Sequence, residues 1–483
     1  DNKLAFRWKD DSRESLFISN ILYGSFSVQG PVKLKKHTMV NNVFGGKINW
    51  VGVAYNAWEK DFADTPIFFK DNVKDRKDFK PLYPVVLEAE KLAVKLPKPK
   101  FPKVVVENLQ IKNVEADSAV ISWKTPEADG FGRIVYKRKG EKNNQYVTSS
   151  DQGSEHLIVL NKLQPDTEYE IRTVLLNRRG KNFFGKPKTF RTAKTTRQPM
   201  VLEVGPGKMS LKEACAVAIA GDTINIAPGR YIGNISLQRS GQPGKPITVK
   251  GNGAILDAAC FYAPMLDISN QSHIIIDGIV FVNPEITARK GIIYANRTSN
   301  VIIRNCRGGI DTALDWRSGG FVMARFCNDF TLENNIIWGC DYPLTFYGKN
   351  LTVKNNTIVK SAMMSLLIYE TENIRIENNI FYRQCVDQKT NQALFFNGKC
   401  SNIVSDGNVF YSPLKTHPIG GRFRDMSGKV LKESPTLKDW QKISGGLDMH
   451  SIHADPMFVD VKKGDFNFKP GSPAAGKGAS IKF

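Results

Sequence analysis

The sequence lacks the cysteine pairs, histidine motifs and long apolar runs that mark several common protein classes. Its seven cysteines form no CxxC pair, which argues against a zinc ribbon or a redox motif. Its six histidines show no HExxH or other metal-ligand spacing. No run approaches the roughly 18 apolar residues of a spanning helix, so no membrane span is expected. The start shows neither Met nor a signal-like stretch, which predicts processed, trimmed or partial ends.

The cysteines are expected to be buried small hydrophobic side chains, with at least one free thiol in a monomer because their number is odd. All of them lie in the C-terminal part of the chain: Cys215, Cys260, Cys306, Cys327, Cys340, Cys385 and Cys400.

The composition describes a large and strongly basic globular protein. The 483 residues predict about two to four domains. Lys and Arg number 68 against 47 Asp and Glu, a formal charge of +21. Such an excess predicts an acidic partner, which could be nucleic acid, an anionic surface or a polyanionic glycan. Nucleic acid is not expected, because no nucleic-acid-reading motif is present.

A small β-sandwich is predicted between two breaks in the chain. The Pro/Lys stretch Leu96–Lys103 is typical of a semi-rigid linker, and a second break falls near Thr195–Pro199. Short alternating segments between them have the period of half-buried strands. Leu163–Tyr169 resembles the tyrosine corner of fibronectin type III domains, in which the tyrosine hydroxyl bonds to upstream backbone, and Trp123 matches their core tryptophan.

A repeat begins after Met200. Alternating strands closed by Gly or Asn recur at an interval in the twenties, which is typical of a solenoid of stacked parallel strands. Asn at the same turn of successive coils can pair with its neighbour, and we predict such a ladder from Asn305, Asn334, Asn355 and Asn378. The repeated strands are Ile274–Gly278, Val301–Asn305, Phe330–Asn334, Leu351–Asn355 and Ile374–Asn378.

The C-terminal region resembles the right-handed parallel β-helix of the pectate-lyase superfamily. Gly221–Tyr231 and Pro246–Gly251 are similar to the opening coils of polysaccharide lyases of the chondroitinase B and alginate-lyase kind. Ala454–Pro473 matches the terminal coil common in secreted β-helix proteins. The resemblance implies a carbohydrate-active protein that is secreted, periplasmic or on the cell surface.

The first ninety residues repeat the same signature. Val32–Val40 aligns with Leu351–Val359, and Ala63–Phe68 echoes the closing element. The fold class predicted is therefore all-β: the tail of a first β-helix (1–95), a linker with a fibronectin type III domain (96–198) and a right-handed parallel β-helix (199–483). Because a solenoid needs about three stacked repeats, a preceding segment or a partner chain is expected to complete the first helix.

The substrate groove of a β-helix usually follows the sheet that precedes the Asn-turn strands. The strands there each end in a polar residue, and stacking at about 4.8 Å would align these residues in a basic stripe with one carboxylate. Charged strand ends are also commonly just solvated. The stripe comprises Arg297, Arg325, Lys349, Glu370 and Lys399, with Tyr347 and Tyr369 offering faces for sugar rings.

Roles follow from what the resemblance implies about lyases, which use Lys or Arg as base and Ca²⁺ on carboxylates to neutralise a uronic acid. The residues predicted to be catalytic are Arg325, Tyr347, Lys349, Tyr369 and Glu370. Those predicted to bind substrate are Arg297, Trp316, Arg317, Tyr342, Asn397, Lys399, Arg422 and Arg424. Asp315 and Asp341 are the predicted Ca²⁺ ligands.

Two alternatives remain open beside β-elimination of an acidic polysaccharide. A glycoside hydrolase needs two acids across the scissile bond, and Asp315, Asp341 and Glu370 are the candidates. A non-catalytic glycan-binding or surface structural protein would use the same basic stripe without turnover.

Overall fold

The computed structural model describes two units, 1–102 and 103–483, each considered by itself. In the first it describes only the backbone of the strands. In the second it describes 104–481 apart from 127, 177–181, 259–263, 283–290, 310–319, 341, 362–363, 383–391 and 414–418, and apart from the side chains of 150–152. No helix of the described residues is long and apolar enough to cross a membrane.

The first unit contains short strands that pair in parallel, as the coils of a β-helix do. The sheet orders are β1-β4-β7, β2-β5-β8 and β3-β6, so each sheet takes every third strand of the chain. Where the structure describes this unit, it contains only strands, in agreement with the predicted fold class. The strands are β1 Leu4–Lys9, β2 Leu16–Ile18, β3 Ile21–Leu22, β4 Ser25–Gln29, β5 His37–Val40, β6 Val43–Phe44, β7 Ile48–Val51 and β8 Ile67–Lys70.

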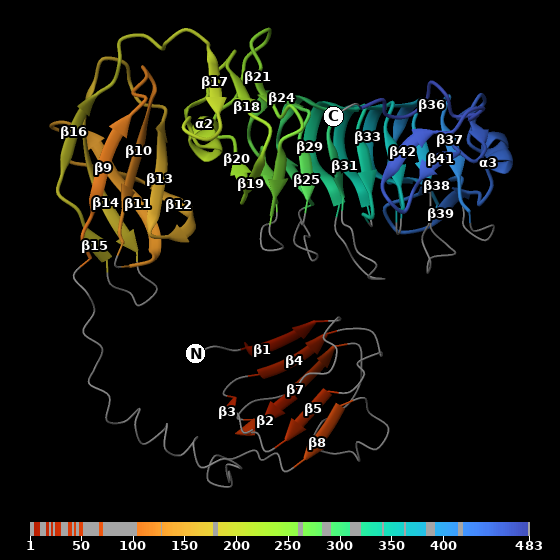
Figure 1. Ribbon diagram of the computed structural model, residues 1–483, viewed down its shortest axis with the longest axis horizontal. Coiled ribbons are helices and arrows are strands. Elements are labelled where there is room, and N and C mark those ends of the chain that lie inside the picture. Colours follow the sequence, from red (N-terminus) through yellow and green to blue (C-terminus); the bar gives the residue numbers. More distant parts are fainter. Residues whose placement is uncertain are drawn as a thin grey trace. The chain divides into compact units, whose positions relative to one another are not determined.

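The second unit opens with a β-sandwich of two antiparallel sheets (Figure 1). One sheet consists of β9 Glu107–Lys112, β10 Ser118–Lys124 and β13 Glu155–Asn161. The other consists of β11 Gly130–Arg138, β12 Gln145–Gly153, β14 Glu168–Leu176, β15 Asn182–Phe184 and β16 Lys188–Arg191. The backbone N–H of Gln164 donates to the Tyr169 hydroxyl at 2.9 Å, and Trp123 is 1 % exposed. The predicted tyrosine corner and core tryptophan are therefore confirmed.

A buried ion-pair cluster joins the sandwich to the first coil of the following β-helix. Asp222 is fully buried and accepts from the guanidinium of Arg197 at 2.9 Å, while the other side of that guanidinium lies 3.2 Å from Glu115 of the sandwich. Ion pairing with Asp222 raises the pKa of Arg197. Val120 and Val159 of the sandwich pack in the same apolar cluster as helix α2 (Leu211–Val217). The sandwich thus covers the apolar start of the β-helix.

The strands of the β-helix stack along its axis (Figure 1) into a 15-stranded sheet and a 9-stranded sheet. The 15-stranded sheet has two faces joined by bent strands, which are called the first and second sheets below, and the 9-stranded sheet is called the third. The first sheet contains β20 Ile235–Ser236, β23 Leu266–Asp267, β26 Ile293–Asn296, β35 Leu394–Asn397 and β38 Gly421–Arg424. The second contains β17 Val201–Val204, β18 Thr223–Ile226, β21 Ile247–Lys250, β24 Ser272–Asp277, β27 Ser299–Arg304 and β36 Ser401–Asp406. The long strands β29 Gly320–Glu333, β31 Tyr342–Lys354 and β33 Leu366–Glu377 bend through both sheets.

The third sheet contains nine short strands, four of which follow the turns at Asn305, Asn334, Asn355 and Asn378. They are β19 Arg230–Ile232, β22 Ile255–Asp257, β25 Val280–Val282, β28 Arg307–Gly309, β30 Ile336–Trp338, β32 Thr357–Val359, β34 Ile380–Tyr382, β37 Val409–Tyr411 and β40 Ile452–His453. The last elements are β39 Val430–Glu433, α3 Leu437–Ile443, β41 Phe458–Asp460 and β42 Asp465–Phe468.

Alternate residues of every strand point into the coil and form apolar rows along the helix axis. One such row is Ile276, Ile303, Leu332, Val353 and Ile376, all fully buried and in register. Burial of one such side chain contributes roughly 1.5–3 kcal/mol. The period of two in the sequence therefore decides which side chains fill the core and which face outward.

The asparagine ladder of the core lies one residue beyond the predicted one. The buried members are Asn335, Asn356, Asn379 and Asn408, all fully buried. Each side-chain amide donates to the carboxamide oxygen of the next member, over distances of 2.9, 3.0 and 3.1 Å. The backbone N–H groups of three members donate to the same oxygens.

The predicted members occupy the preceding turn position instead. Asn305, Asn334, Asn355 and Asn378 have a left-handed backbone, with φ between 53° and 56°. Asparagine tolerates that conformation better than most side chains, which explains its recurrence there. The predicted pairing is found between Asn334 and Asn305, whereas the continuous ladder consists of the residue that follows each turn and points inward. Asn334 still donates to Asn305 at 2.6 Å, outside the core.

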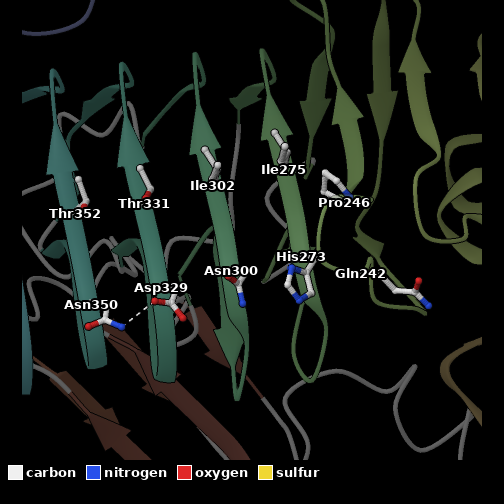
Figure 2. A pocket seen from close by; sticks show the side chains of 11 residues that line it. Gln242, Pro246, His273, Ile275, Asn300, Ile302, Asp329, Thr331, Asn350 and Thr352 are labelled. Carbon is white, nitrogen blue, oxygen red and sulfur yellow. Dashed lines mark hydrogen bonds between the residues drawn. The ribbon is translucent and has the colours of Figure 1, made fainter.

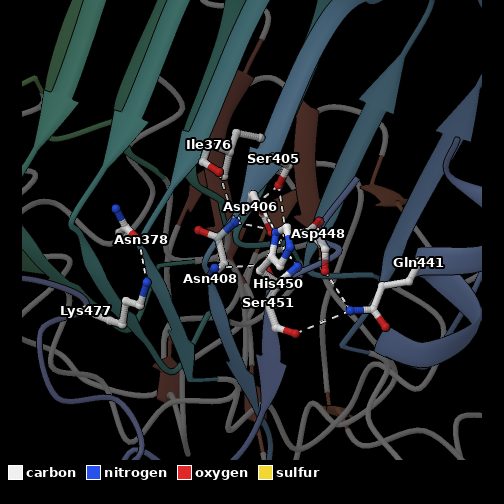
Figure 3. A network of polar contacts seen from close by, with 10 residues as sticks. All are labelled: Ile376, Asn378, Ser405, Asp406, Asn408, Gln441, Asp448, His450, Ser451 and Lys477. Atoms are coloured by element: carbon white, nitrogen blue, oxygen red, sulfur yellow. Dashed lines mark hydrogen bonds and ion pairs between the residues drawn. The ribbon is translucent and has the colours of Figure 1, made fainter. Parts of the chain in front are cut away.

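A buried carboxylate ends the ladder near the C-terminal coils (Figure 3). Asp448 is fully buried and accepts hydrogen bonds from Asn408, Ser405 and Ser451 at 2.8–3.0 Å. The indole N–H of Trp440, on α3, donates to its second oxygen at 3.0 Å. These bonds attach the capping helix α3 to the end of the ladder.

We predict that Asn379→Ala lowers the free energy of unfolding by about 2–4 kcal/mol, because the Asn356 N–H and the Val353 carbonyl lose their buried partner. Asn328→Ala, an exposed position on β29, serves as the control and should change stability by less than about 0.5 kcal/mol. Urea unfolding measures both. Equal effects at the two sites would contradict the role of the ladder.

A second prediction concerns pH. Burial raises the pKa of the Asp448 carboxyl, so the folded state favours its protonated form. Its contribution to stability is complete below the unfolded pKa of about 3.9 and is lost as pH rises through the higher folded value. The stability of the wild type relative to Asp448→Asn should therefore fall as pH rises from acid to neutral. A relative stability that stays constant or rises in urea titrations would show this assignment to be wrong.

Candidate functional site

Two outward rows of side chains cross the strands of the first sheet in register. They lie two residues apart on each strand and therefore share one face. The first row is Tyr294, Met323, Thr345, Leu367, Phe395 and Arg422. The second, called the site row below, is Asn296, Arg325, Tyr347, Tyr369, Asn397 and Arg424.

The site row brings together several residues predicted from the sequence. Arg325 is in register with Tyr347, Tyr347 with Tyr369, and Tyr369 with Asn397. Neighbouring strands place these residues about 4.8 Å apart along the axis. Arg325 is exposed, and the two tyrosines and Asn397 are half-buried. A cation, two phenols and an amide therefore stand side by side on one outward face.

An aromatic cluster lies beside the site row. Leu367 and Phe395 are buried with Met364, and Tyr342 and Tyr369 pack against them. The predicted binding residue Tyr342 thus contributes to this cluster. The sequence predicted no role for Phe395, although it predicted roles for Asn397 and Lys399 a few residues further along the chain.

Arg422 and Arg424, both predicted to bind substrate, have partners in this structure. Arg422 forms an ion pair with Glu433, and its guanidinium carbon lies 5.4 Å from the Phe395 ring centroid. Arg424 donates from Nε to the Gly428 carbonyl at 2.6 Å. The nearby Asp425 pairs with neither arginine in the described contacts and accepts from Ser427 at 2.7 Å and from the Lys429 backbone N–H. The arginines are therefore held at the C-terminal end of the two rows, and Glu433 offsets one of the two charges.

The turn that follows the site row holds bulky side chains in a left-handed backbone. Arg297, Phe326 and Glu370 have φ of 55°, 54° and 38°, and Gly398 takes the turn after β35. Such a conformation costs a residue with a Cβ roughly 1–2 kcal/mol. Phe326 is 54 % exposed and meets the Tyr347 ring edge-on at 4.8 Å. Backbone strain that places side chains on the exposed surface of this turn favours a functional role for the turn.

The predicted stripe does not form one row. Lys349 lies on the second-sheet part of β31, in register with Asn328 and Glu372, and its ammonium is 3.6 Å from the Glu372 carboxylate. The bend of β31 is one residue shorter than that of β29, so Gly348 pairs with Cys327 and Lys349 moves past the turn. Arg297 and Glu370 are turn residues, and Lys399 follows Gly398 as an exposed residue. Only Arg325 of the five belongs to the site row.

Four predicted residues, Asp315, Trp316, Arg317 and Asp341, lie outside the described residues. The Ca²⁺ site assigned to Asp315 and Asp341 therefore stays a prediction. Within the part of the chain that the structure describes, no group of three or more His, Cys, Asp or Glu side chains could hold a metal ion.

The described cysteines are core residues rather than ligands. Cys215, Cys306 and Cys327 are buried free thiols, Cys340 is buried, and Cys400 is half-buried. Burial raises the pKa of Cys215 and of Cys306 to about 12. Thiols held in the protonated form do not bind metals readily.

Two family models match separate stretches of the chain. Residues 104–191 match the fibronectin type III domain, and residues 219–427 match a family described as periplasmic copper-binding protein (NosD). Each match spans less than half of the chain. No curated protein matches it. The described residues do not fit a copper site built from these side chains, because four of their five cysteines are buried and no group of three or more His, Cys, Asp or Glu among them could hold a metal ion.

Solved structures with similar folds share little sequence. A fibronectin type III domain of human collagen XX is 18% identical over 20% of this chain and 99% of that chain, with a TM-score of 0.17. The family 28 exopolygalacturonase of Yersinia enterocolitica is 11% identical over 68% of this chain and 90% of its own, with a TM-score of 0.25. Pectate lyase Pel3 of Pectobacterium carotovorum is 11% identical over 67% and 93%, with a TM-score of 0.16. Likenesses at these scores say nothing about activity.

The positions of Arg325 and Lys349 predict that removing their charges has unequal effects on binding to an acidic polymer. Arg325→Ala should lower the salt concentration that elutes the protein from a polygalacturonate column, because the in-register neighbours of Arg325, Asn296 and Tyr347, carry no carboxylate. Lys349→Ala should have a smaller effect, since Glu372 already offsets its charge. Lys438→Ala on α3 controls for loss of one exposed charge. A larger effect at Lys349 than at Arg325 would place the binding surface elsewhere.

Proposed function

We propose that the β-helix binds an acidic polysaccharide along the site row and cleaves it by β-elimination. The observation that supports the proposal is the juxtaposition of Arg325, Tyr347, Tyr369 and Asn397 on successive coils. The formal charge of +21 adds a long-range attraction for a polyanion. The family matched by residues 219–427 is described as periplasmic, which supports a location outside the cytoplasm.

Binding would use the length of the row. A polymer lying along the axis meets one new side chain about every 4.8 Å, so consecutive sugars meet consecutive coils. Tyr347, Tyr369 and exposed Phe326 offer aromatic surface, while Arg325 and Asn397 offer hydrogen-bond donors to carboxylate and hydroxyl oxygens. The donors sit on either side of the tyrosine pair, about three coil spacings apart, so the stretch of polymer over the two tyrosines is held at both ends.

The chemistry needs a charge neutraliser, a base and an acid. Arg325 pairs with the uronate carboxylate, which makes the adjacent carbon-bound proton more acidic. One tyrosine takes that proton, a carbon–carbon double bond forms, and the carbon–oxygen bond to the leaving sugar breaks. The departing oxygen receives a proton from the other tyrosine. In this scheme Glu370, the residue after Tyr369, orients the phenols. Lys349 takes no part in the chemistry.

A hydrolase is the second candidate, favoured by the exposed carboxylate of Glu370 in the strained turn beside the row. Hydrolysis needs a second acid, and Asp315 and Asp341 remain its candidates. Binding without turnover would use the same row.

The test is an absorbance assay on polygalacturonate, alginate and sulfated glycosaminoglycans. Elimination leaves an unsaturated product that absorbs in the near ultraviolet, and hydrolysis leaves reducing ends without it. Tyr347→Phe and Tyr369→Phe should each lower the rate by about 10²–10⁴-fold. Tyr146→Phe, exposed on the sandwich, should leave it unchanged.

Other outcomes reject the proposal in defined ways. Reducing ends without absorbance favour the hydrolase, and Glu370→Gln should then abolish activity. Polymer binding without new ends favours the non-catalytic function. Full activity in both tyrosine variants would show that the site row does not take part in catalysis.

A further inference from the structure

A separate groove of about 430 Å³ crosses the outer face of the second sheet (Figure 2). Its floor is a row of short branched side chains in register, Ile275, Ile302, Thr331 and Thr352. They come from β24, β27, β29 and β31, strands that also build or adjoin the site row on another face. The groove runs along the helix axis, as a site for a linear ligand would.

The rim on one side consists of polar residues with a left-handed backbone. Asn300, Asp329 and Asn350 have φ of 55°, 53° and 56°, and each precedes a floor residue by two positions. Asn350 donates from its amide to Asp329 at 2.8 Å, and Asn373 donates to Asn350 at 2.7 Å. These bonds fix the direction in which the amides present their remaining donors and acceptors. His273 continues the rim by one coil.

The opposite border is a row of longer charged side chains that pair across coils. Arg304 donates to Asp277 at 2.8 Å, and the Lys354 ammonium lies 2.9 Å from Glu333. Their charges offset one another. The groove lining itself contains the carboxylate of Asp329 and no arginine or lysine.

A rigid turn closes the groove at its N-terminal end. Gln242 and Lys245 exchange backbone hydrogen bonds of 3.0 and 2.8 Å, and the Gly241 N–H donates to the Ser272 carbonyl at 2.8 Å. Ser240 accepts from the Ser272 N–H at 3.0 Å. The turn is thus attached to β24, and the groove is formed before any ligand arrives.

We propose that this groove is a second binding site, for a linear, uncharged glycan. Amide and carboxylate groups at fixed spacing suit hydroxyl groups, and the flat floor of methyl groups suits the apolar edges of sugar rings. Asp329 would repel a polyanion, and no cation lines the groove to offset it. A peptide strand would need a free sheet edge, whereas the backbone here is paired on both sides.

This site goes beyond the proposed function, because its charge selects against the acidic polymer of the site row. One chain would then hold a neutral polymer on the second sheet while the first sheet acts on an acidic one. The two faces can be tested separately, since no residue is shared between their lining rows.

The experiment is isothermal titration calorimetry of the whole chain with cello-, manno-, xylo- and laminarihexaose. We expect saturable binding of at least one of them, with no competition from a galacturonate hexasaccharide. Thr331→Arg should weaken it by about tenfold or more, because the guanidinium fills the floor. Arg375 already occupies the same row two coils further on, so the fold tolerates this side chain.

Two controls make the result specific. Val404→Arg adds the same charge to the same row beyond the groove and should leave the affinity unchanged. Arg325→Ala should also leave it unchanged while weakening binding to the acidic polymer. Absence of binding by all four neutral hexasaccharides, equal binding by Thr331→Arg, or displacement by the acidic hexasaccharide would each overturn the proposal.

Discussion

The buried asparagine ladder holds successive coils of the β-helix in one register. Each carboxamide of Asn335, Asn356 and Asn379 is fully buried, donates to the next coil and accepts from the coil before it. A slip by one residue would break these bonds and turn every apolar side chain outward. The register therefore fixes which outward residues become neighbours, and both candidate binding surfaces depend on it.

The same coils serve different chemistry on different faces. On the first sheet the outward residues of β29, β31 and β33 are Arg325, Tyr347 and Tyr369, next to a strained turn. On the second sheet the outward residues of β29 and β31 are threonines beside a hydrogen-bonded rim. Because the strands bend between the two sheets, one strand supplies a residue to each surface. This geometry explains how a repetitive fold carries two unlike surfaces.

The sequence predicted the fold well because its signals are local or periodic. The Leu163–Tyr169 segment specifies its own hydrogen bond, and the alternation of apolar residues specifies the stacked strands. The sequence prediction failed where a shift of one residue decides which side chain points inward or to which row it belongs. Asn334 and Asn335 are adjacent and identical, so composition does not reveal which one points inward. The sequence placed Lys349 in the stripe because the bend of β31, one residue shorter than that of β29, can be recognised only from the pairing of the strands.

The central claim is that an acidic polymer lies along the site row. The most direct measurement is a crystal structure of the Tyr347→Phe, Tyr369→Phe double variant with a bound galacturonate hexasaccharide. The account predicts that the sugar chain runs along the helix axis, with a carboxylate on Arg325 and a ring beside residues 347 and 369. A hexasaccharide bound in the groove floored by Ile302 and Thr331, or on the fibronectin type III sandwich, would contradict it.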